Sequence, residues 1–348
     1  MTLDPVATVE ACYRPAADDS SWLAGILETL DGLQLGGGFV ARVKDAGPGG
    51  GFRTLAAAAR GVDVEDWADR IESVHAMAPP GSLAAIYWPC PPVRRARAVA
   101  RQIGPEAEQL LATALGAIGF DDSWGVLAGG PEGRLLDIGI GVRGRAHLAP
   151  RTRHQLALIS AHLTSALRLR ACLAASVPGP ESERTEAVLD PGGTVRHAVG
   201  PAETLEARQS LTLAVQHMER ARGRLRRTSP EEAMEIWRGL VDGRWSLVDH
   251  HESSGRRLVL VRRNDPLLPD PRVLTARERD VLAYAALGHS SKYVAYLLGL
   301  APGTVASHLS RACQKLQVKN RREAVALLWP GLVPPPPSTP GAPPPRSG

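Results

Sequence analysis

The stretch best suited to chemistry is Pro302–Leu316, whose polar and apolar residues follow the period of a helix. Thr304, Ser307 and Arg311 recur at spacings of three and four, as residues along one helix face do. Hydroxyl and guanidinium groups can donate hydrogen bonds to base edges and to phosphates. The opposite face is apolar and consists of Val305, Leu309, Ala312 and Leu316. The segment therefore predicts a helix that packs by one face and offers the other to a nucleic acid.

Basic charge gathers around this segment. Residues 274–328 hold eight cations and three anions, so their net charge of +5 equals that of the whole 348-residue chain. A surplus confined to one short stretch is typical of a module that binds a polyanion. Only four of the 41 basic residues are lysines, and none of them follows a glycine. That scarcity excludes a phosphate-binding loop of the Gly-Lys-Ser/Thr kind.

Capping signals divide this basic segment into four short helices. The signals for helix starts are Thr275 with Glu278, Ser291 ahead of Lys292–Leu298, Pro302, and Asn320 with Glu323. The signals for helix ends are Gly288 and Gly299. Helices joined by turns this short predict a tri-helical helix-turn-helix with one added helix.

Four ordered motifs in this segment resemble the LuxR-type DNA-binding domain of transcriptional regulators. The motifs are Leu-Thr-x-Arg-Glu from 274, Leu-Gly-His-Ser-Ser-Lys from 287, Leu-Gly-Leu-x-Pro-x-Thr-Val-x-x-His-Leu from 298, and Lys-Leu-x-Val-x-x-Arg from 315. The resemblance covers about a sixth of the chain. It implies an all-α domain that binds double-stranded DNA in the major groove, usually as a homodimer.

The expected DNA-binding residues come from the resemblance and from the helix geometry. By resemblance, the motif positions near DNA or bracing the recognition helix are Lys292, Thr304, Val305, His308 and Lys315. From their places on the helices, we add Ser291, Ser307 and Arg311. Two positions depart from the family pattern: Ala306 stands where Lys is frequent, and Ala301 replaces a capping Ser worth about 0.5–2 kcal/mol. The rival hypothesis is an interaction protein whose helical module binds another protein.

The N-terminal two-thirds has mixed helix and strand patterns. Helices are expected over 20–35, 67–74, 105–118, 151–173, 202–225 and 230–241, the last capped by Ser229. Strands are expected over 39–43 (bounded by glycines 36–38), 123–128, 134–140, 187–189, 195–198, 245–249 and 257–262. This α+β region loosely resembles the small-ligand sensory folds of the GAF and PAS type, and the sequence contains no internal repeat. The helix over 151–173 is a candidate to pair with its copy in a dimer.

We expect five segments along the chain. They are an α/β GAF-like sensor domain over 1–177, a smaller PAS-like α/β domain over 184–263, a linker over 264–271, the helix-turn-helix domain over 272–330, and a disordered proline-rich tail over 331–348. No apolar run is long enough to span a membrane and the N-terminus lacks a basic signal, which favours a cytoplasmic protein.

The sequence contains no set of residues with the spacing of a catalytic site or a metal site. The four cysteines are scattered without a CxxC pair, and the histidines lack zinc-ligand spacing. The GxGxxG match at Gly139–Gly144 precedes no helix signal, so we interpret it as glycine at a strand end. The tyrosines Tyr284, Tyr293 and Tyr296 are interpreted as packing for a small core. The sequence therefore predicts a regulator with no enzymatic activity, no cofactor, and a small molecule or protein as possible effector of its N-terminal region.

Overall fold

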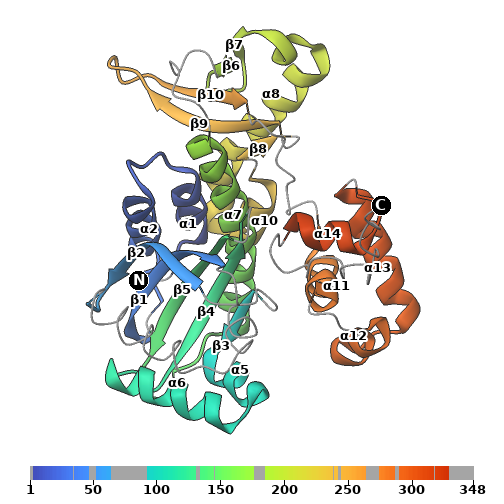
Figure 1. The fold of residues 1–348 in the computed structure, drawn as a ribbon. Coiled ribbons are helices and arrows are strands. Elements are labelled where there is room, and N and C mark those ends of the chain that lie inside the picture. Colours follow the sequence, from blue (N-terminus) through green and yellow to red (C-terminus); the bar gives the residue numbers. More distant parts are fainter. Residues whose placement is uncertain are drawn as a thin grey trace, which may run out of the picture.

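Two antiparallel sheets and a separate helical domain make up the chain (Figure 1). The computed structural model describes residues 3–33, 35–46, 52–63, 92–130, 134–144, 146–175, 185–237, 239–241, 244–263, 274–286, 290–316 and 318–328. The predicted helix over 67–74, the predicted linker over 264–271 and the predicted tail lie outside these residues. Among the described helices, none combines the length and apolarity needed to cross a membrane.

The first sheet has five strands in the order β2-β1-β5-β4-β3, and every neighbouring pair is antiparallel. Its strands are β1 (Gly36–Ala46), β2 (Phe52–Arg60), β3 (Val93–Arg95), β4 (Asp122–Gly129) and β5 (Arg134–Val142). β4 and β5 correspond to the strands predicted over 123–128 and 134–140, and they pair with each other. β1 is longer than predicted, because the glycines expected to bound it lie inside it. The Cβ of any residue at Gly37 would come within 2.4 Å of the Gly141 carbonyl on β5, so only glycine permits this approach.

Helices cover both faces of this sheet. On one face lie α1 (Pro5–Tyr13), α2 (Asp19–Glu28) and α7 (Pro150–Ala175), and on the other lie α5 (Ala96–Ile103) and α6 (Pro105–Ala117) (Figure 1). Side chains alternate along the strands: Trp124, Val126 and Ala128 of β4 point into the main hydrophobic core under α7. The intervening Ser123, Gly125 and Leu127 face α5 and α6.

The second sheet repeats the strand order of the first. It reads β7-β6-β10-β9-β8, which in chain order within the sheet is again 2-1-5-4-3. Its strands are β6 (Thr185–Leu189), β7 (Val195–Ala198), β8 (Leu240–Val241), β9 (Trp245–His251) and β10 (Arg257–Arg263). The helices between β7 and β8 are η3 (Gly200–Glu203), α8 (Leu205–Arg220), η4 (Ala221–Leu225), α9 (Arg226–Thr228) and α10 (Pro230–Ile236). The two sheets therefore share a strand topology although the sequence contains no internal repeat.

Helix predictions in this part needed two corrections. The single helix expected over 202–225 is divided, because Gly223 has non-helical dihedral angles near its end. The helix expected over 230–241 stops at Ile236, and residues 240–241 pair with β9 instead. Ser229 precedes α10 as expected, but its side chain makes no capping hydrogen bond.

The two sheets share one hydrophobic core, which continues across α1, α7 and α10. Within this core His162 of α7 joins all three helices: its Nε2 donates to the Met234 carbonyl at 3.0 Å, and its Nδ1 lies 3.1 Å from the Tyr13 hydroxyl oxygen. A carbonyl can only accept, so Nε2 carries a proton. Arg222 and Arg226 of the second region also reach back to Glu10 of α1.

α7 cannot serve as the predicted dimerisation helix along its middle. Side chains from Gln155 to Leu169 are buried or partly buried on every side by α1, the sheet and α10. The apolar face seen in the sequence is the one that holds the first sheet. The dimerisation prediction is therefore contradicted for residues 155–169, because this part of the helix has no face left for a second copy.

The C-terminal region is a bundle of four helices with its own small cores. They are α11 (Ala276–Ala286), α12 (Ser291–Leu298), α13 (Pro302–Lys315) and α14 (Arg321–Leu328). The four-helix prediction is confirmed. Both predicted capping boxes form: the Thr275 amide donates to Glu278 at 2.8 Å, and the Glu323 amide donates to Asn320 at 3.0 Å. The cap of α12 is Ser290 rather than Ser291, since the Ser290 hydroxyl accepts from the Tyr293 amide.

Candidate nucleic-acid interface

The turn between α12 and α13 fixes how the second helix is presented. Gly299 ends α12 in the left-handed conformation, with φ of 63°, and Pro302 begins α13 only three residues later. Ala301 stands at the N-cap and its side chain makes no hydrogen bond. The start of α13 therefore has no capping side chain: Pro302 lacks an amide hydrogen, the Thr304 amide donates to the Ala301 carbonyl at 2.9 Å, and Gly303 contributes the first amide that a phosphate could meet.

α13 has the two faces that its sequence predicts. Val305 and Ala312 are fully buried against α11 and α12, and Leu309 packs beside them. Thr304, Ser307, Arg311 and Gln314 are exposed. The apolar stripe thus fastens the helix to the bundle, and the polar stripe is left accessible.

Two exposed cations of this domain have no carboxylate partner among the described residues. Lys292 and Arg311 are exposed, and neither forms an ion pair with any residue in the described part of the chain. The acids near them are engaged elsewhere: Glu278 is buried and binds Lys315 at 2.8 Å, and Glu323 serves its capping box. Unpaired cations on an accessible surface are what phosphate contacts need.

Glu278 connects the recognition helix to α11. Burial raises the pKa of its carboxyl, but hydrogen bonds from Lys315 and the Thr275 amide outweigh this effect, so the pKa lies below its ordinary value. Arg277 of α11 donates to the Leu298 carbonyl at 2.8 Å and so joins α11 to α12. The carboxylate therefore stays ionised and holds the C-terminal end of α13 in place.

The structure separates the predicted interface residues into three groups. Lys292, Thr304, Ser307 and Arg311 lie on the exposed surface. The prediction that Val305 contacts DNA is corrected, because its side chain is fully buried and braces the helix instead of facing DNA. Ser291 and His308 are half-buried, and the buried Nδ1 of His308 has no hydrogen-bond partner within the described residues.

Ser307 and Lys315 are exposed but already engaged. The Ser307 hydroxyl donates to the Gly303 carbonyl one turn earlier at 3.0 Å, so its oxygen is available mainly as an acceptor. Lys315 is 38% exposed at its side chain while it binds Glu278. Both residues therefore support the shape of α13 at least as much as they offer contacts.

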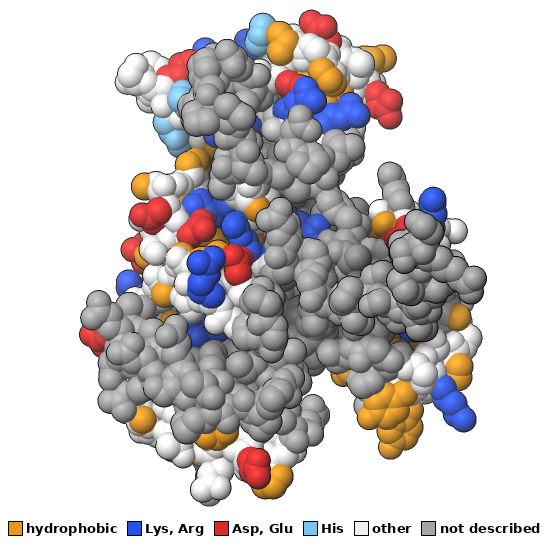
Figure 2. Space-filling model, viewed as in Figure 1, with side chains coloured by type: hydrophobic (Ala, Val, Ile, Leu, Met, Phe, Trp, Pro, Cys, Tyr) orange, Lys and Arg blue, Asp and Glu red, His pale blue; other side chains and the backbone are white. Residues whose placement is uncertain are grey.

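Two exposed tyrosines on α12 were not expected from the sequence. Tyr293 and Tyr296 are 47% and 81% exposed, and their rings stack at 6.4 Å between centroids. The interpretation of these two as core packing is wrong, whereas Tyr284 does pack against the bundle. Figure 2 shows hydrophobic side chains beside a basic one at this end of the domain. Their spacing of three places them on one helix face, but nothing in the sequence says that this face is open.

Comparison with known proteins identifies the helical region. Residues 272–328 match the family model GerE, described as bacterial regulatory proteins of the luxR family. The transcriptional regulatory protein YvfU of Bacillus subtilis is 41% identical over 61 residues, which are 18% of this chain and 30% of that protein. The regulatory protein DesR of Bacillus subtilis is 36% identical over 72 residues, 21% of this chain and 36% of that protein. This chain thus matches about a third of the length of these relatives.

A third relative and one solved structure complete the comparison. The probable transcriptional regulatory protein NarL of Mycobacterium tuberculosis is 48% identical over 54 residues, 16% of this chain and 25% of that protein. A structure of SdiA in complex with octanoyl-rac-glycerol aligns with 93% of this chain and 92% of its own, at 12% identity and a TM-score of 0.31. A TM-score this low supports no argument about the sheets. Residues 272–328 of this chain form a helix-turn-helix domain of the luxR family of bacterial regulatory proteins.

Proposed function

We propose that this protein is a transcriptional regulator that binds double-stranded DNA through α13. The observation that supports this most directly is the exposed stripe of Thr304, Ser307 and Arg311, with Lys292 nearby and no carboxylate pairing either cation within the described domain. A helix presented in this way fits the major groove, and cations at its margins contact phosphates. DNA as the partner also accords with a cytoplasmic location.

The direct test is selection from random duplex DNA followed by gel shift with the full chain. The double variant Arg311→Ala/Lys292→Ala should bind the selected sequence at least tenfold more weakly, since each lost cation removes a charge-assisted contact. Arg208→Ala on α8 is the control for net charge, because Arg208 is exposed far along the chain from the helical domain. Equal binding by the double variant, or no selected sequence at all, would favour a protein partner instead.

We further propose that residues 1–177 and 184–263 are two sensory domains of the GAF and PAS kind. The repeated strand order supports treating each sheet as one domain, and the shared core through α1, α7 and α10 offers a route by which one influences the other. Limited proteolysis tests the division: cleavage between residues 178 and 183 should leave two fragments that remain associated.

We include a homodimer in this proposal, and it predicts the spacing of the two half-sites in the operator. Two recognition helices on one face of DNA require half-sites about 10 base pairs apart. Because the middle of α7 is buried, the dimer contact must involve another surface. Light scattering on the full chain, with and without the selected duplex, measures the stoichiometry.

A further inference from the structure

A cavity lies against the first sheet, on the side that α5 and α6 cover. Its volume is about 110 Å³, and it is partly open to solvent. A closed apolar cavity of about 150 Å³ is enough to hold benzene. A partly open cavity of this size therefore accepts a molecule whose body is about as large as one aromatic ring.

Two paired glycines form part of the floor of the cavity. Gly125 of β4 and Gly139 of β5 both line it, and they are partners across the two strands. A Cβ added at Gly125 would meet nothing nearer than the Arg94 carbonyl at 4.0 Å, so it would project into open space. The space therefore depends on the missing side chain, and a larger residue at Gly125 would occupy it.

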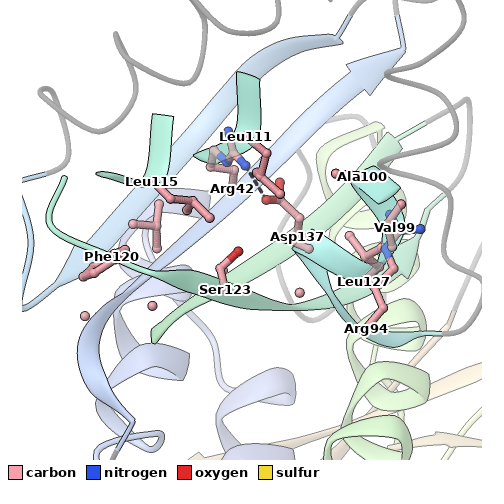
Figure 3. Close-up of a pocket in the computed structure, with 16 residues that line it drawn as sticks. Arg42, Arg94, Val99, Ala100, Leu111, Leu115, Phe120, Ser123, Leu127 and Asp137 are labelled. Atoms are coloured by element: carbon pink, nitrogen blue, oxygen red, sulfur yellow. Dashed lines mark hydrogen bonds and ion pairs between the residues drawn. The ribbon is translucent and has the colours of Figure 1, made fainter. Parts of the chain in front are cut away.

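Aliphatic side chains form most of the walls. Leu111 and Leu115 of α6, Val99 of α5 and Leu127 of β4 all line the cavity. Figure 3 shows the two leucines of α6 along one side, and Val99 with Leu127 along another. Such a lining stabilises the hydrocarbon part of a ligand by removing it from water.

The charged groups of the lining already have partners. Arg42 and Asp137 form a buried ion pair across β1 and β5, and the Nζ of Lys44 lies 3.3 Å from the same carboxylate. Arg94 is buried and has an interaction partner as well. A charged ligand would lose its hydration here without gaining an ionic partner of its own, which costs free energy. The lining therefore favours a neutral ligand.

One uncharged polar group faces the cavity. Among the described lining residues, Ser123 of β4 is the one with a neutral polar side chain. Its amide donates to the Asp122 carboxylate at 2.8 Å, whereas its hydroxyl forms no hydrogen bond with a described residue. Figure 3 shows this hydroxyl directed away from β4, toward the side on which Leu115 lies. Because a hydroxyl both donates and accepts, it can pair with the hydroxyl of a ligand.

We propose that this cavity binds a small neutral hydroxyl compound about the size of phenol. The ring would lie over Gly125 and Gly139 against Leu115, and its hydroxyl would form a hydrogen bond with the hydroxyl of Ser123. Apolar contacts would supply the affinity, and this hydrogen bond would orient the ligand. The regulatory meaning of the site rests on the proposed function, because it makes the first domain the sensor of that regulator.

Calorimetry on the full chain at pH 7 tests the ligand class with phenol and benzoate. Both have one aromatic ring, but phenol is neutral at this pH, since a phenolic hydroxyl has a pKa of about 10, and benzoate is an anion. We expect saturable binding of phenol, with benzoate bound about tenfold more weakly or not at all, because its charge would be desolvated without a partner. Failure of phenol to bind, or equal binding of benzoate, would overturn the proposal.

The variant Ser123→Ala tests the hydrogen bond, with toluene as the matched ligand. Toluene has the shape of phenol but carries a methyl group in place of the hydroxyl, so it gains nothing from Ser123. The variant should bind phenol about two- to tenfold more weakly than the parent, as the loss of one neutral hydrogen bond predicts, and should bind toluene as the parent does. An unchanged affinity for phenol would overturn the assignment of Ser123.

The variant Gly125→Val tests the place of the site, because its side chain fills the cavity and should abolish binding of both phenol and toluene. Gly116→Val is the control: Gly116 lies on the exposed side of α6, where an added Cβ meets no atom within 4 Å. Thermal unfolding of each protein identifies a variant that fails to fold. If Gly125→Val does not fold, Gly125→Ala places one methyl group in the same space and should weaken both ligands. Binding like that of the parent in a folded Gly125 variant would show that the cavity is not the site.

DNA binding is measured separately, so the two proposals can fail independently. Phenol binding without any DNA binding would retain the cavity site and reject the regulator. DNA binding without phenol binding would retain the regulator and reject the cavity site.

Discussion

Four arginines of the sheet region, residues 3–263, have surroundings opposite to those of Arg311 in the helix-turn-helix domain. In the sheet region, Arg42, Arg95, Arg170 and Arg222 each bind a carboxylate, and these side chains are largely buried. In the helical domain, Arg311 is exposed and has no carboxylate partner among the described residues. An arginine thus stabilises the fold where a carboxylate lies beside it. Where no carboxylate lies beside it, the arginine is available to a binding partner. The balance of acids and bases along the chain follows the same division, since the whole positive surplus lies in the helical domain.

The largest effect on the free energy of unfolding is expected for a substitution that removes the carboxylate of a buried ion pair in the first sheet. Burial raises the pKa of the Asp137 carboxyl, but Arg42 and Lys44 outweigh that effect and keep the pKa below its ordinary value, so the group is ionised. Asp137→Asn leaves two buried cations without it and should lower the free energy of unfolding by about 3–5 kcal/mol. Urea unfolding measures this loss.

Asp45→Asn provides the matched control for this change on the same sheet. Asp45 of β1 pairs with the exposed Arg53 at 3.7 Å and with the half-buried Arg134 at 3.4 Å, so its loss should cost about 1 kcal/mol. Similar costs for the two substitutions would contradict the distinction between buried and exposed pairs.

A second large effect is expected at Arg222, which joins the two sheets. Its guanidinium contacts Glu10 and Glu219, each at 2.8 Å, and also Asp249, and it lies 4.9 Å from the centre of the Trp237 ring. Arg222→Ala should destabilise the sheet region by about 2 kcal/mol, because three carboxylates lose a shared partner. Differential scanning calorimetry should show this loss in the transition of the sheets and none in that of the helical domain. A shift confined to the helical domain would contradict this assignment.

The helical domain could be predicted from sequence because its signals are local. Capping boxes such as Thr275 with Glu278, the left-handed Gly299 and the first-turn Pro302 each act within one helical turn, and all of them appear in the structure. The spacing that defines the two faces of α13 is equally local. The sequence does not show which helix face stays uncovered in the folded domain. The prediction that Tyr296 packs in the core is wrong for that reason.

The sheets were less predictable because their contacts join residues far apart in the chain. The strand pair of β1 and β5 brings Arg42 beside Asp137 across 95 positions, and no local pattern reveals such a partner. The sequence leaves α7 as a candidate for pairing with its copy, because period alone cannot distinguish a helix packed on one side from one packed on several. The cavity over Gly125 likewise depends on register, which only the assembled sheet defines.

The contacts of Arg311 and Lys292 with phosphates should be measurable in the salt dependence of the affinity for DNA. For Arg311→Ala and for Lys292→Ala, the slope of log affinity for duplex DNA against log salt should fall by about 0.9 each, which is one phosphate contact. Neither variant should change the melting temperature, since neither side chain has an ion pair to lose in the described structure. Gel shifts at several salt concentrations give the slopes. An unchanged slope would remove that residue from the interface.

The smallest effect is expected at Glu231, an intermediate case in which a carboxylate of α10 meets a largely exposed arginine of α7. Hydrogen bonding from Arg151 is the main cause that lowers the pKa of Glu231 to about 2, with Gln155 adding to it at 2.8 Å. Because the folded pKa lies below the ordinary value of 4.5, the stabilisation is complete above pH 4.5 and is lost as the pH falls toward 2. The melting temperatures of the parent and of Glu231→Gln should therefore differ at pH 6 and converge near pH 2. A difference that persists at pH 2 would show that this contact acts through packing and not through charge.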